Sequence, residues 1–151
     1  FAQMETLRAT SAMPYVSQIV EVNGKQYLDG GIADSIPLKK AQSLGFDKII
    51  VVLTRPLSYR KSPSPTLLPK LFYRRYPKLV QTLINRYAEY NQSVEEIIQQ
   101  EQAGEIFVIR PSKTLAIKRI EKDLNKVQAM YDLGIADAHS QLANLKAYLS
   151  Q

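Results

Sequence analysis

Cysteine is absent from the sequence, and histidine occurs once, at His139. The lack of cysteine excludes a disulfide framework, a thiol nucleophile and a cysteine-ligated metal. A single histidine likewise argues against a site built from several histidines, so we expect no metal and no cofactor. His139 lies in a helical pattern far from any motif, and we interpret it as a surface residue rather than a catalytic base.

Long apolar runs are also missing. No stretch approaches the roughly 18 residues of a membrane span, and no signal-peptide pattern is present. The chain begins with Phe1 rather than Met, which suggests a piece of a longer protein whose targeting signal would lie upstream. The absence of cysteine is compatible with a reducing compartment, and we expect a cytoplasmic protein.

Acidic residues are absent between Lys48 and Ala88, where nine of the 20 lysines and arginines lie. The net charge of +6 is therefore spread unevenly. Such a basic block suggests an anionic partner, which could be a membrane surface, an acidic protein or nucleic acid. The alternative is a solvated basic face without a specific partner.

Size and composition fit one domain with a sizeable core, since the chain has 151 residues of which 45% are hydrophobic. Residues 1–12 carry a weak helical pattern. Residues 16–22 alternate apolar and polar side chains as a half-buried strand does. The pair Asn23-Gly24 follows, the strongest short hairpin signal, so residues 26–28 are predicted to return as a second strand.

The hairpin is followed by Asp29-Gly30-Gly31, within the stretch YLDGGIADSIPLKKA. Asp-Gly commonly makes a hairpin turn, but the preceding Asn-Gly pair already supplies one. The other interpretation is a carboxylate held at the edge of an α/β sheet, beside two glycines that permit close approach by other atoms.

A helix and a buried strand come next. Ser35 is a suitable N-cap, Pro37 stands in the first helical turn, and the pattern runs to Gly45. Residues 48–54 (KIIVVLT) form a continuous β-branched run, typical of a parallel strand buried on both faces. Strand, helix and strand at this spacing predict a βαβ unit with a right-handed crossover. The Asp-Gly-Gly turn would then lie at the carboxyl end of a strand, where open α/β sheets bind ligands.

The remaining chain contains a loop, a long helix and another strand. Residues 55–77 hold five prolines among serine, tyrosine and basic residues, which predicts a surface loop with one helical turn near Leu71. Residues 78–102 repeat apolar positions at helical spacing, and residues 105–110 predict a buried strand.

The C-terminal part predicts two helices. Asp123 is expected to cap residues 124–133, Gly134 to break the pattern, and residues 135–149 to form a second amphipathic helix. Several carboxylates have helix-surface or capping positions without paired acid–base geometry, namely Glu95, Glu96, Glu121 and Asp123. These patterns together predict the α/β class.

Residues 7–52 (LRATSAMPYVSQIVEVNGKQYLDGGIADSIPLKKAQSLGFDKIIVV) resemble the carboxyl-terminal half of the patatin-like phospholipases. In that family an Ala/Ser-rich segment leads to a proline and a strand, which ends in Asp-Gly-Gly or Asp-Gly-Ala before a proline and a helix. A Gly-x-Asp triplet then introduces a hydrophobic strand, here Gly45-Phe46-Asp47. The tail at residues 105–138 also looks like bacterial members, and the resemblance is weakest over residues 58–102.

The resemblance implies part of a three-layer α/β/α fold, with a mainly parallel sheet and a β-hairpin, in one domain over residues 1–151. Three regions are expected in it: 1–54 with the catalytic aspartate, the basic Pro/Tyr loop 55–77, and the helical and strand region 78–151. It also implies a serine hydrolase with a Ser–Asp dyad, in which Asp29 orients the serine hydroxyl and takes its proton. Gly30 and Gly31 would shape the backbone near the site.

The chain departs from the family pattern because it has neither a Gly-x-Ser-x-Gly elbow nor a glycine-rich oxyanion loop. Ser11, Ser17 and Ser35 are not flanked by glycines in that way. We therefore expect the nucleophile upstream of this chain, and no hydrolase activity from the chain alone. Because a free aspartate has a pKa near about 3.9, a dyad aspartate also needs desolvation or nearby negative charge to act as a base.

Two functional hypotheses follow. In the first, the chain is the C-terminal part of an acyl-ester hydrolase that acts on membrane lipids, and the basic loop at residues 55–77 contacts an anionic membrane. In the second, the chain is a non-catalytic α/β binding module with Asp29 as a turn residue and the basic loop as its membrane- or anion-binding surface. Nucleic acid ranks behind membrane and solvent as the loop's partner, because no nucleic-acid fold motif accompanies it.

Overall fold

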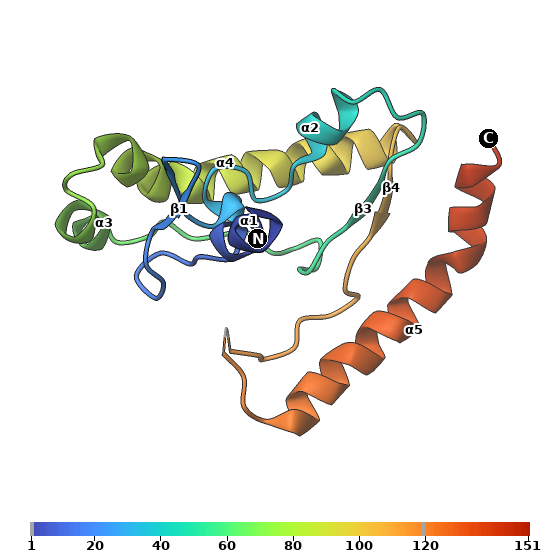
Figure 1. The fold of residues 1–151 in the computed structure, drawn as a ribbon. Coiled ribbons are helices and arrows are strands. Elements are labelled where there is room, and N and C mark those ends of the chain that lie inside the picture. The colour runs from blue at the N-terminus through green and yellow to red at the C-terminus, as the bar shows by residue number, and fades with distance from the viewer. Residues whose placement is uncertain (1, 119) are drawn as a thin grey trace. The chain divides into compact units, whose positions relative to one another are not determined.

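The computed structural model describes residues 2–118 and 120–151, so Phe1 lies outside the described residues (Figure 1). The chain divides into two compact units. Unit 1 contains Phe1–Pro37 and Arg60–Glu95, and unit 2 contains Leu38–Tyr59 and Glu96–Gln151. The expected single domain with its three regions stays a prediction.

Unit 1 begins with helix α1, Ala2–Thr10, which the weak helical pattern predicted. Strands β1 (Val20–Val22) and β2 (Lys25–Tyr27) form the predicted antiparallel hairpin, and Val22 is paired with Lys25. Asn23 and Gly24 both have positive φ, at 52° and 72°, as a two-residue type I′ turn requires. The first strand is shorter than predicted because Val16 and Ser17 donate their amides to the Met13 carbonyl in a turn.

Two apolar clusters hold unit 1 together. In the first, Ala9 and Ala12 pack on Val20 of the hairpin. In the second, Ile32, Tyr73 and Leu83 are buried together, which joins the segment after the hairpin to helices α3 (Leu67–Phe72) and α4 (Pro77–Gln102). Helix α3 extends the single turn predicted near Leu71, and α4 confirms the predicted long helix.

Unit 2 contains strands β3 (Ile50–Val52) and β4 (Phe107–Ile109), which pair in parallel with Val51 opposite Val108. The expectation of a strand buried on both faces is wrong for β3, because Ile50 and Val52 are 42% and 69% exposed. In the described chain β4 is its sheet partner, and the face that carries Ile50 and Val52 is open.

The predicted βαβ unit is also wrong. Strands β2 and β3 belong to different two-stranded sheets, although helix α2 (Leu38–Gln42) stands between them in the sequence. The parallel pair is formed instead by β3 and β4, which are separated in sequence by α3 and α4. Over the described residues the structure is thus mixed α/β, with one parallel strand pair and one antiparallel hairpin.

The last helix, α5, runs from Leu124 to Leu149 without interruption. The Asp123 carboxylate caps it by accepting a hydrogen bond from the Asn125 amide at 3.0 Å, as predicted. The predicted break at Gly134 is wrong, since a glycine inside a helix costs only about 1 kcal/mol relative to alanine and neighbouring turns can compensate for it. His139 lies on this helix and is exposed, as expected of a surface residue.

Tyr148, near the end of α5, is bound to the start of both parallel strands. Its hydroxyl accepts a hydrogen bond from the Ile49 amide at 3.2 Å and donates to the Glu105 carbonyl at 3.1 Å. Its ring packs against Phe107 with 5.7 Å between centroids, and the Lys48 ammonium lies 4.5 Å from the ring centre. One buried tyrosine therefore joins three elements of unit 2.

None of the helices in the described residues is both long and apolar enough to cross a membrane. Over the same residues, histidines, aspartates and glutamates do not gather in a group of three that could bind a metal ion.

Candidate functional site

Asp29 lies two residues after the end of β2 and immediately before η1, a single 3-10 turn at Gly30–Ile32. Its backbone amide donates to the Ala12 carbonyl at 2.9 Å, which ties the turn to the end of α1. Its side-chain Oδ1 accepts a hydrogen bond from the Gly31 amide at 2.7 Å. The carboxylate is half-buried, and this short contact fixes one of its two oxygens while the other keeps its acceptor capacity.

Gly31 is the most constrained position of the turn. Its carbonyl accepts two hydrogen bonds, from Arg86 Nε at 2.8 Å and from Ser35 Oγ at 2.7 Å. A Cβ atom at Gly31 would lie 3.1 Å from Asp29 Oδ1 and 3.6 Å from Arg86 Nη2. A side chain here would therefore press on the Asp29 carboxylate. Gly30 is less constrained, because its Cβ would meet Thr10 Oγ1 at 3.4 Å, an ordinary contact.

Ser35 has a different role from the predicted helix cap. Its hydroxyl donates to the Gly31 carbonyl four residues earlier, and α2 begins only at Leu38. The physical reason is that a serine hydroxyl can bind backbone groups on either side of it, and the Gly31 carbonyl can accept a second hydrogen bond beside that from Arg86. Ser35 thus stabilises the Asp29 turn.

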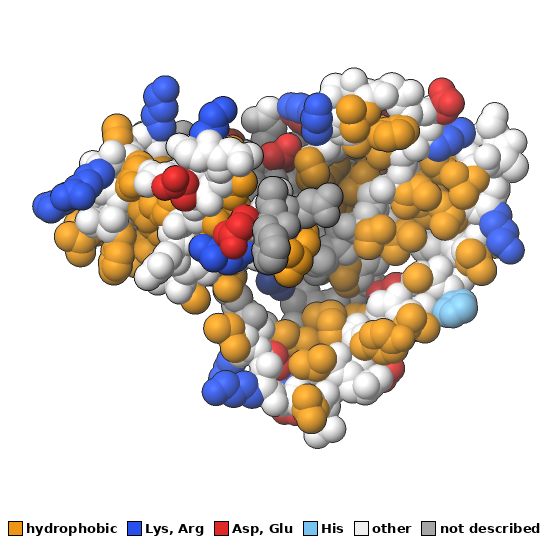
Figure 2. All heavy atoms as spheres, viewed as in Figure 1, with side chains coloured by type: hydrophobic (Ala, Val, Ile, Leu, Met, Phe, Trp, Pro, Cys, Tyr) orange, Lys and Arg blue, Asp and Glu red, His pale blue; other side chains and the backbone are white. Residues whose placement is uncertain are grey.

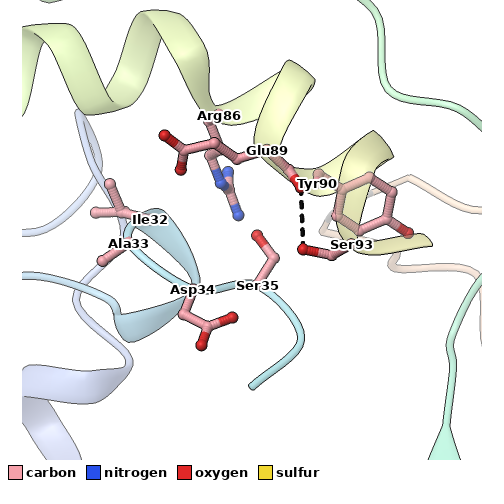
Figure 3. Close-up of a pocket in the computed structure, with 8 residues that line it drawn as sticks. All are labelled: Ile32, Ala33, Asp34, Ser35, Arg86, Glu89, Tyr90 and Ser93. Carbon is pink, nitrogen blue, oxygen red and sulfur yellow. Dashed lines mark hydrogen bonds between the residues drawn. The ribbon is translucent and has the colours of Figure 1, made fainter. Parts of the chain in front are cut away.

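Arg86 was not singled out by the sequence patterns. It lies on α4, and Figure 3 shows its guanidinium pointing from the helix toward the turn that carries Ala33 to Ser35. A signal was nevertheless present, because Arg86 is three and seven residues after Leu83 and Leu79 and so shares the buried stripe of α4. A half-buried arginine on such a stripe needs a polar partner, which the Gly31 carbonyl supplies.

A small cavity of about 30 Å³ lies between this turn and α4 (Figure 3). It is lined by Ile32, Ala33, Asp34, Ser35, Arg86, Glu89, Tyr90 and Ser93. The Ser93 hydroxyl donates to the Glu89 carbonyl at 3.0 Å, within its own helix. This volume accommodates water-sized molecules and no acyl chain, so the cavity is not a substrate pocket.

A larger groove of about 420 Å³ is formed by residues of α1, β1 and the segment between them. It is lined by Arg8, Ser11, Ala12, Ser17, Gln18 and Val20. Ala12 connects this groove to the Asp29 turn, because it lines the groove and its carbonyl accepts a hydrogen bond from the Asp29 amide. The groove has the size of a small-molecule site and is mainly polar along its walls.

The serines near Asp29 are engaged with the backbone. The Ser11 hydroxyl donates to the carbonyls of Leu7 and Arg8, and the Ser35 hydroxyl donates to Gly31. Across the described residues, none of the serine hydroxyls hydrogen-bonds with the Asp29 carboxylate. Over the described residues, the predicted site residues Asp29, Gly30 and Gly31 therefore lie in one turn, and no serine hydroxyl is hydrogen-bonded to the carboxylate.

Family models match the chain in two separate segments. Residues 2–41 match the patatin-like phospholipase family, a segment that includes α1, the hairpin and the Asp29 turn. Residues 76–150 match a domain of unknown function, DUF6363. The resemblance to patatin-like proteins is thus found in the N-terminal stretch, whereas the tail at residues 105–138 falls in the DUF6363 match. Arg86 contributes to the Asp29 turn from within the second segment.

The chain is also similar to the uncharacterized protein YjjU of Escherichia coli (strain K12). The two are 28% identical over 141 residues, which cover 87% of this chain and 38% of YjjU. The chain therefore spans well under half of the length of this curated relative. The N-terminal family match suggests a relationship to lipid hydrolases.

Proposed function

We propose that the chain forms part of an acyl-ester hydrolase that acts on lipids and that Asp29 is the carboxylate of its Ser–Asp dyad. The observation that carries this proposal is the position of Asp29. It is a half-buried carboxylate on a turn held by the Gly31 amide, inside the segment that matches the patatin-like phospholipases.

The proposed chemistry is general-base catalysis. Asp29 would accept the proton of a serine hydroxyl as that oxygen attacks the ester carbonyl, and would return the proton to the leaving alcohol. The bond from Gly31 restricts rotation of the carboxylate, which keeps its second oxygen in a defined direction. The serine and the oxyanion donors would come from residues upstream of this chain, and the 420 Å³ groove beside Ala12 is large enough for part of a lipid ester.

The substitution Asp29→Asn in the native-length gene product tests the role. Asparagine keeps the size of the side chain and an oxygen that can accept the Gly31 amide, so the turn is preserved while the base is lost. Hydrolysis of a p-nitrophenyl acyl ester should fall by about 10²- to 10⁴-fold in kcat, the usual contribution of a general base.

Asp34→Asn is the matched control, because Asp34 is an exposed aspartate five residues away and its carboxylate points away from α4 in Figure 3. It should hydrolyse the ester at the wild-type rate. If Asp29→Asn also retains the wild-type rate, Asp29 is a turn residue and not the catalytic base. If the wild-type gene product neither hydrolyses the ester nor reacts with a fluorophosphonate probe, the alternative of a non-catalytic α/β binding module becomes the better account.

A further inference from the structure

Helix α3 divides its side chains between a buried face and an apolar exposed face. Pro69 is buried, and so is Tyr73 immediately after the helix, four residues later. The side chains between and around them point outward: Leu67, Leu71 and Phe72 are 73%, 67% and 60% exposed, and Leu68 is also exposed. Because residues three and four apart share a helix face, the four apolar side chains form one surface rather than scattered contacts.

The base of this surface is fixed to the rest of unit 1. The Tyr15 amide donates to the Tyr73 hydroxyl at 2.9 Å, and the Tyr15 ring packs edge-on against Phe72 with 5.6 Å between centroids. A second contact joins the rings of Tyr15 and Tyr73 at 5.4 Å. The exposed apolar side chains are thus presented by an anchored helix.

Basic side chains surround the apolar ones. Lys70, Arg74, Arg75 and Lys78 are all exposed, and no carboxylate among the described residues forms an ion pair with any of the four. The nearby Arg60 differs, since it is paired with Glu95 at 2.6 Å. Figure 2 shows hydrophobic and basic side chains close together over the part of unit 1 that contains α3. We call the residues 67, 68, 70–72, 74, 75 and 78 the α3 surface.

We propose that the α3 surface binds an anionic lipid membrane, with its leucines and Phe72 at the level of the acyl boundary and its basic residues at the headgroups. Exposed leucine and phenylalanine side chains beside lysine and arginine are the composition of an interfacial membrane contact. Charge complementarity favours this occupant, because the surface offers cations with no carboxylate to neutralise them. A contiguous apolar patch of this kind is unusual on a face that stays in water.

This proposal rests on the proposed function, because membrane binding would bring a site that acts on lipids to its substrate. Its test, however, does not depend on Asp29 being the catalytic base. Binding is measured without turnover, and the Asp29→Asn protein should bind vesicles as the wild type does. A failure of hydrolysis and a failure of binding are therefore separable.

The experiment is vesicle co-sedimentation with the native-length gene product. Vesicles of phosphatidylcholine alone are compared with vesicles containing 30% phosphatidylserine (about one anionic lipid in three, a composition that gives a strong surface potential). We expect binding to the anionic vesicles that weakens as the salt concentration rises. The double substitution Arg74→Gln with Arg75→Gln should lower the partition coefficient about tenfold or more.

Matched control variants distinguish binding by the α3 surface from nonspecific adsorption to vesicles. Leu71→Ser should weaken binding several-fold, whereas Leu124→Ser, which alters a more exposed leucine at the start of α5, should not. Lys113→Gln with Lys118→Gln removes the same charge from exposed positions elsewhere and should have little effect. Because all these residues are exposed, the variants should fold, which circular dichroism checks.

Several results would overturn the proposal. One is a wild-type protein that does not bind anionic vesicles, and another is equal loss from the control and α3 variants. A third is an α3 variant that binds vesicles as the wild type does but has a reduced affinity for a DNA oligonucleotide. A fourth is an α3 variant that binds vesicles as the wild type does but no longer forms a dimer that the wild type shows on size-exclusion chromatography. The last two results would assign the α3 surface to nucleic acid and to a second copy of the chain, respectively.

Discussion

Arg86 and Gly31 lie 55 positions apart in the sequence, yet the guanidinium Nε donates a 2.8 Å hydrogen bond to the glycine carbonyl. Gly31 in turn donates its amide to the Asp29 carboxylate at 2.7 Å. Helix α4 is therefore connected to the proposed catalytic aspartate through one intervening residue, Gly31. Arg86 is a positioning residue in this arrangement.

We expect Arg86→Ala to lower kcat for ester hydrolysis about tenfold in the native-length gene product, with KM nearly unchanged. The reason is that the half-buried Gly31 carbonyl loses its charged donor, a loss that costs about 1–3 kcal/mol, while no substrate contact is removed. Arg86→Lys should restore part of the rate because an ammonium can also donate to the carbonyl. Steady-state kinetics measure both constants.

The control for this prediction is Asn85→Ala, an exposed neighbour on the same helix. It should leave kcat and KM unchanged. If Arg86→Ala raises KM alone, or if Arg86→Lys is no better than alanine, the arginine acts in another way than by holding the turn.

The substitution Gly31→Ala should also reduce hydrolysis, because the new methyl group would lie 3.1 Å from Asp29 Oδ1. A contact this short forces the carboxylate to move by a few tenths of an ångström, and an error of this size at a general base slows catalysis. Activity should fall about tenfold while the circular dichroism spectrum is preserved.

Gly134→Ala serves as the matched control, since a Cβ at Gly134 meets no atom within 4 Å. It should keep full activity and raise stability by up to about 1 kcal/mol, the helix preference of alanine over glycine. Thermal unfolding gives the stability change. An equal loss of activity from both glycine substitutions would contradict the role assigned to Gly31.

Tyr148→Phe should destabilise the protein by about 1–3 kcal/mol. The substitution keeps the ring contact with Phe107 but leaves the Ile49 amide and the Glu105 carbonyl without their shared partner. Urea unfolding of the protein, followed by circular dichroism, measures the loss. Tyr131→Phe, which alters an exposed tyrosine of the same helix, should change the free energy of unfolding by less than about 0.5 kcal/mol.

The pKa of the Tyr15 hydroxyl is raised above its usual value of 10.0 by burial and by the neighbouring Tyr73. The folded state therefore disfavours tyrosinate at this position, so the stability that neutral Tyr15 contributes is present below pH 10 and lost as the pH rises through the folded pKa. As the pH rises above 10, the wild type should lose stability faster than Tyr15→Phe. Parallel stability curves for the two proteins would contradict this linkage.

Local sequence patterns were sufficient to predict those elements whose conformation is set by residues close together in the sequence. Asn23-Gly24 predicted the hairpin because positive φ at two successive positions is a property of those residues. Residues 78–102 predicted α4 because an amphipathic stripe of this length has one stable conformation. Asp123 predicted its cap for the same reason, since the acceptor and the amide lie two residues apart.

Tertiary structure decided what these elements contact. Strand β3 pairs with β4 rather than with the hairpin, because strand pairing is set by which edges meet and is not encoded in the composition of one strand. Gly134 continues α5, since packing along a helix can offset a local preference of about 1 kcal/mol. Ser35 turned back to Gly31 instead of capping α2, because a serine hydroxyl binds whichever backbone group the fold leaves open.

The sequence by itself determined the Asp-Gly-Gly turn and its likeness to patatin-like phospholipases, because both are carried by neighbouring residues in order. It also determined the basic stretch, which is a matter of composition. Only the tertiary structure brought Arg86 to the Gly31 carbonyl and gave α3 an anchored, apolar exposed face. Those relationships join residues far apart in the chain, and they exist only once side-chain packing has fixed which surfaces are buried.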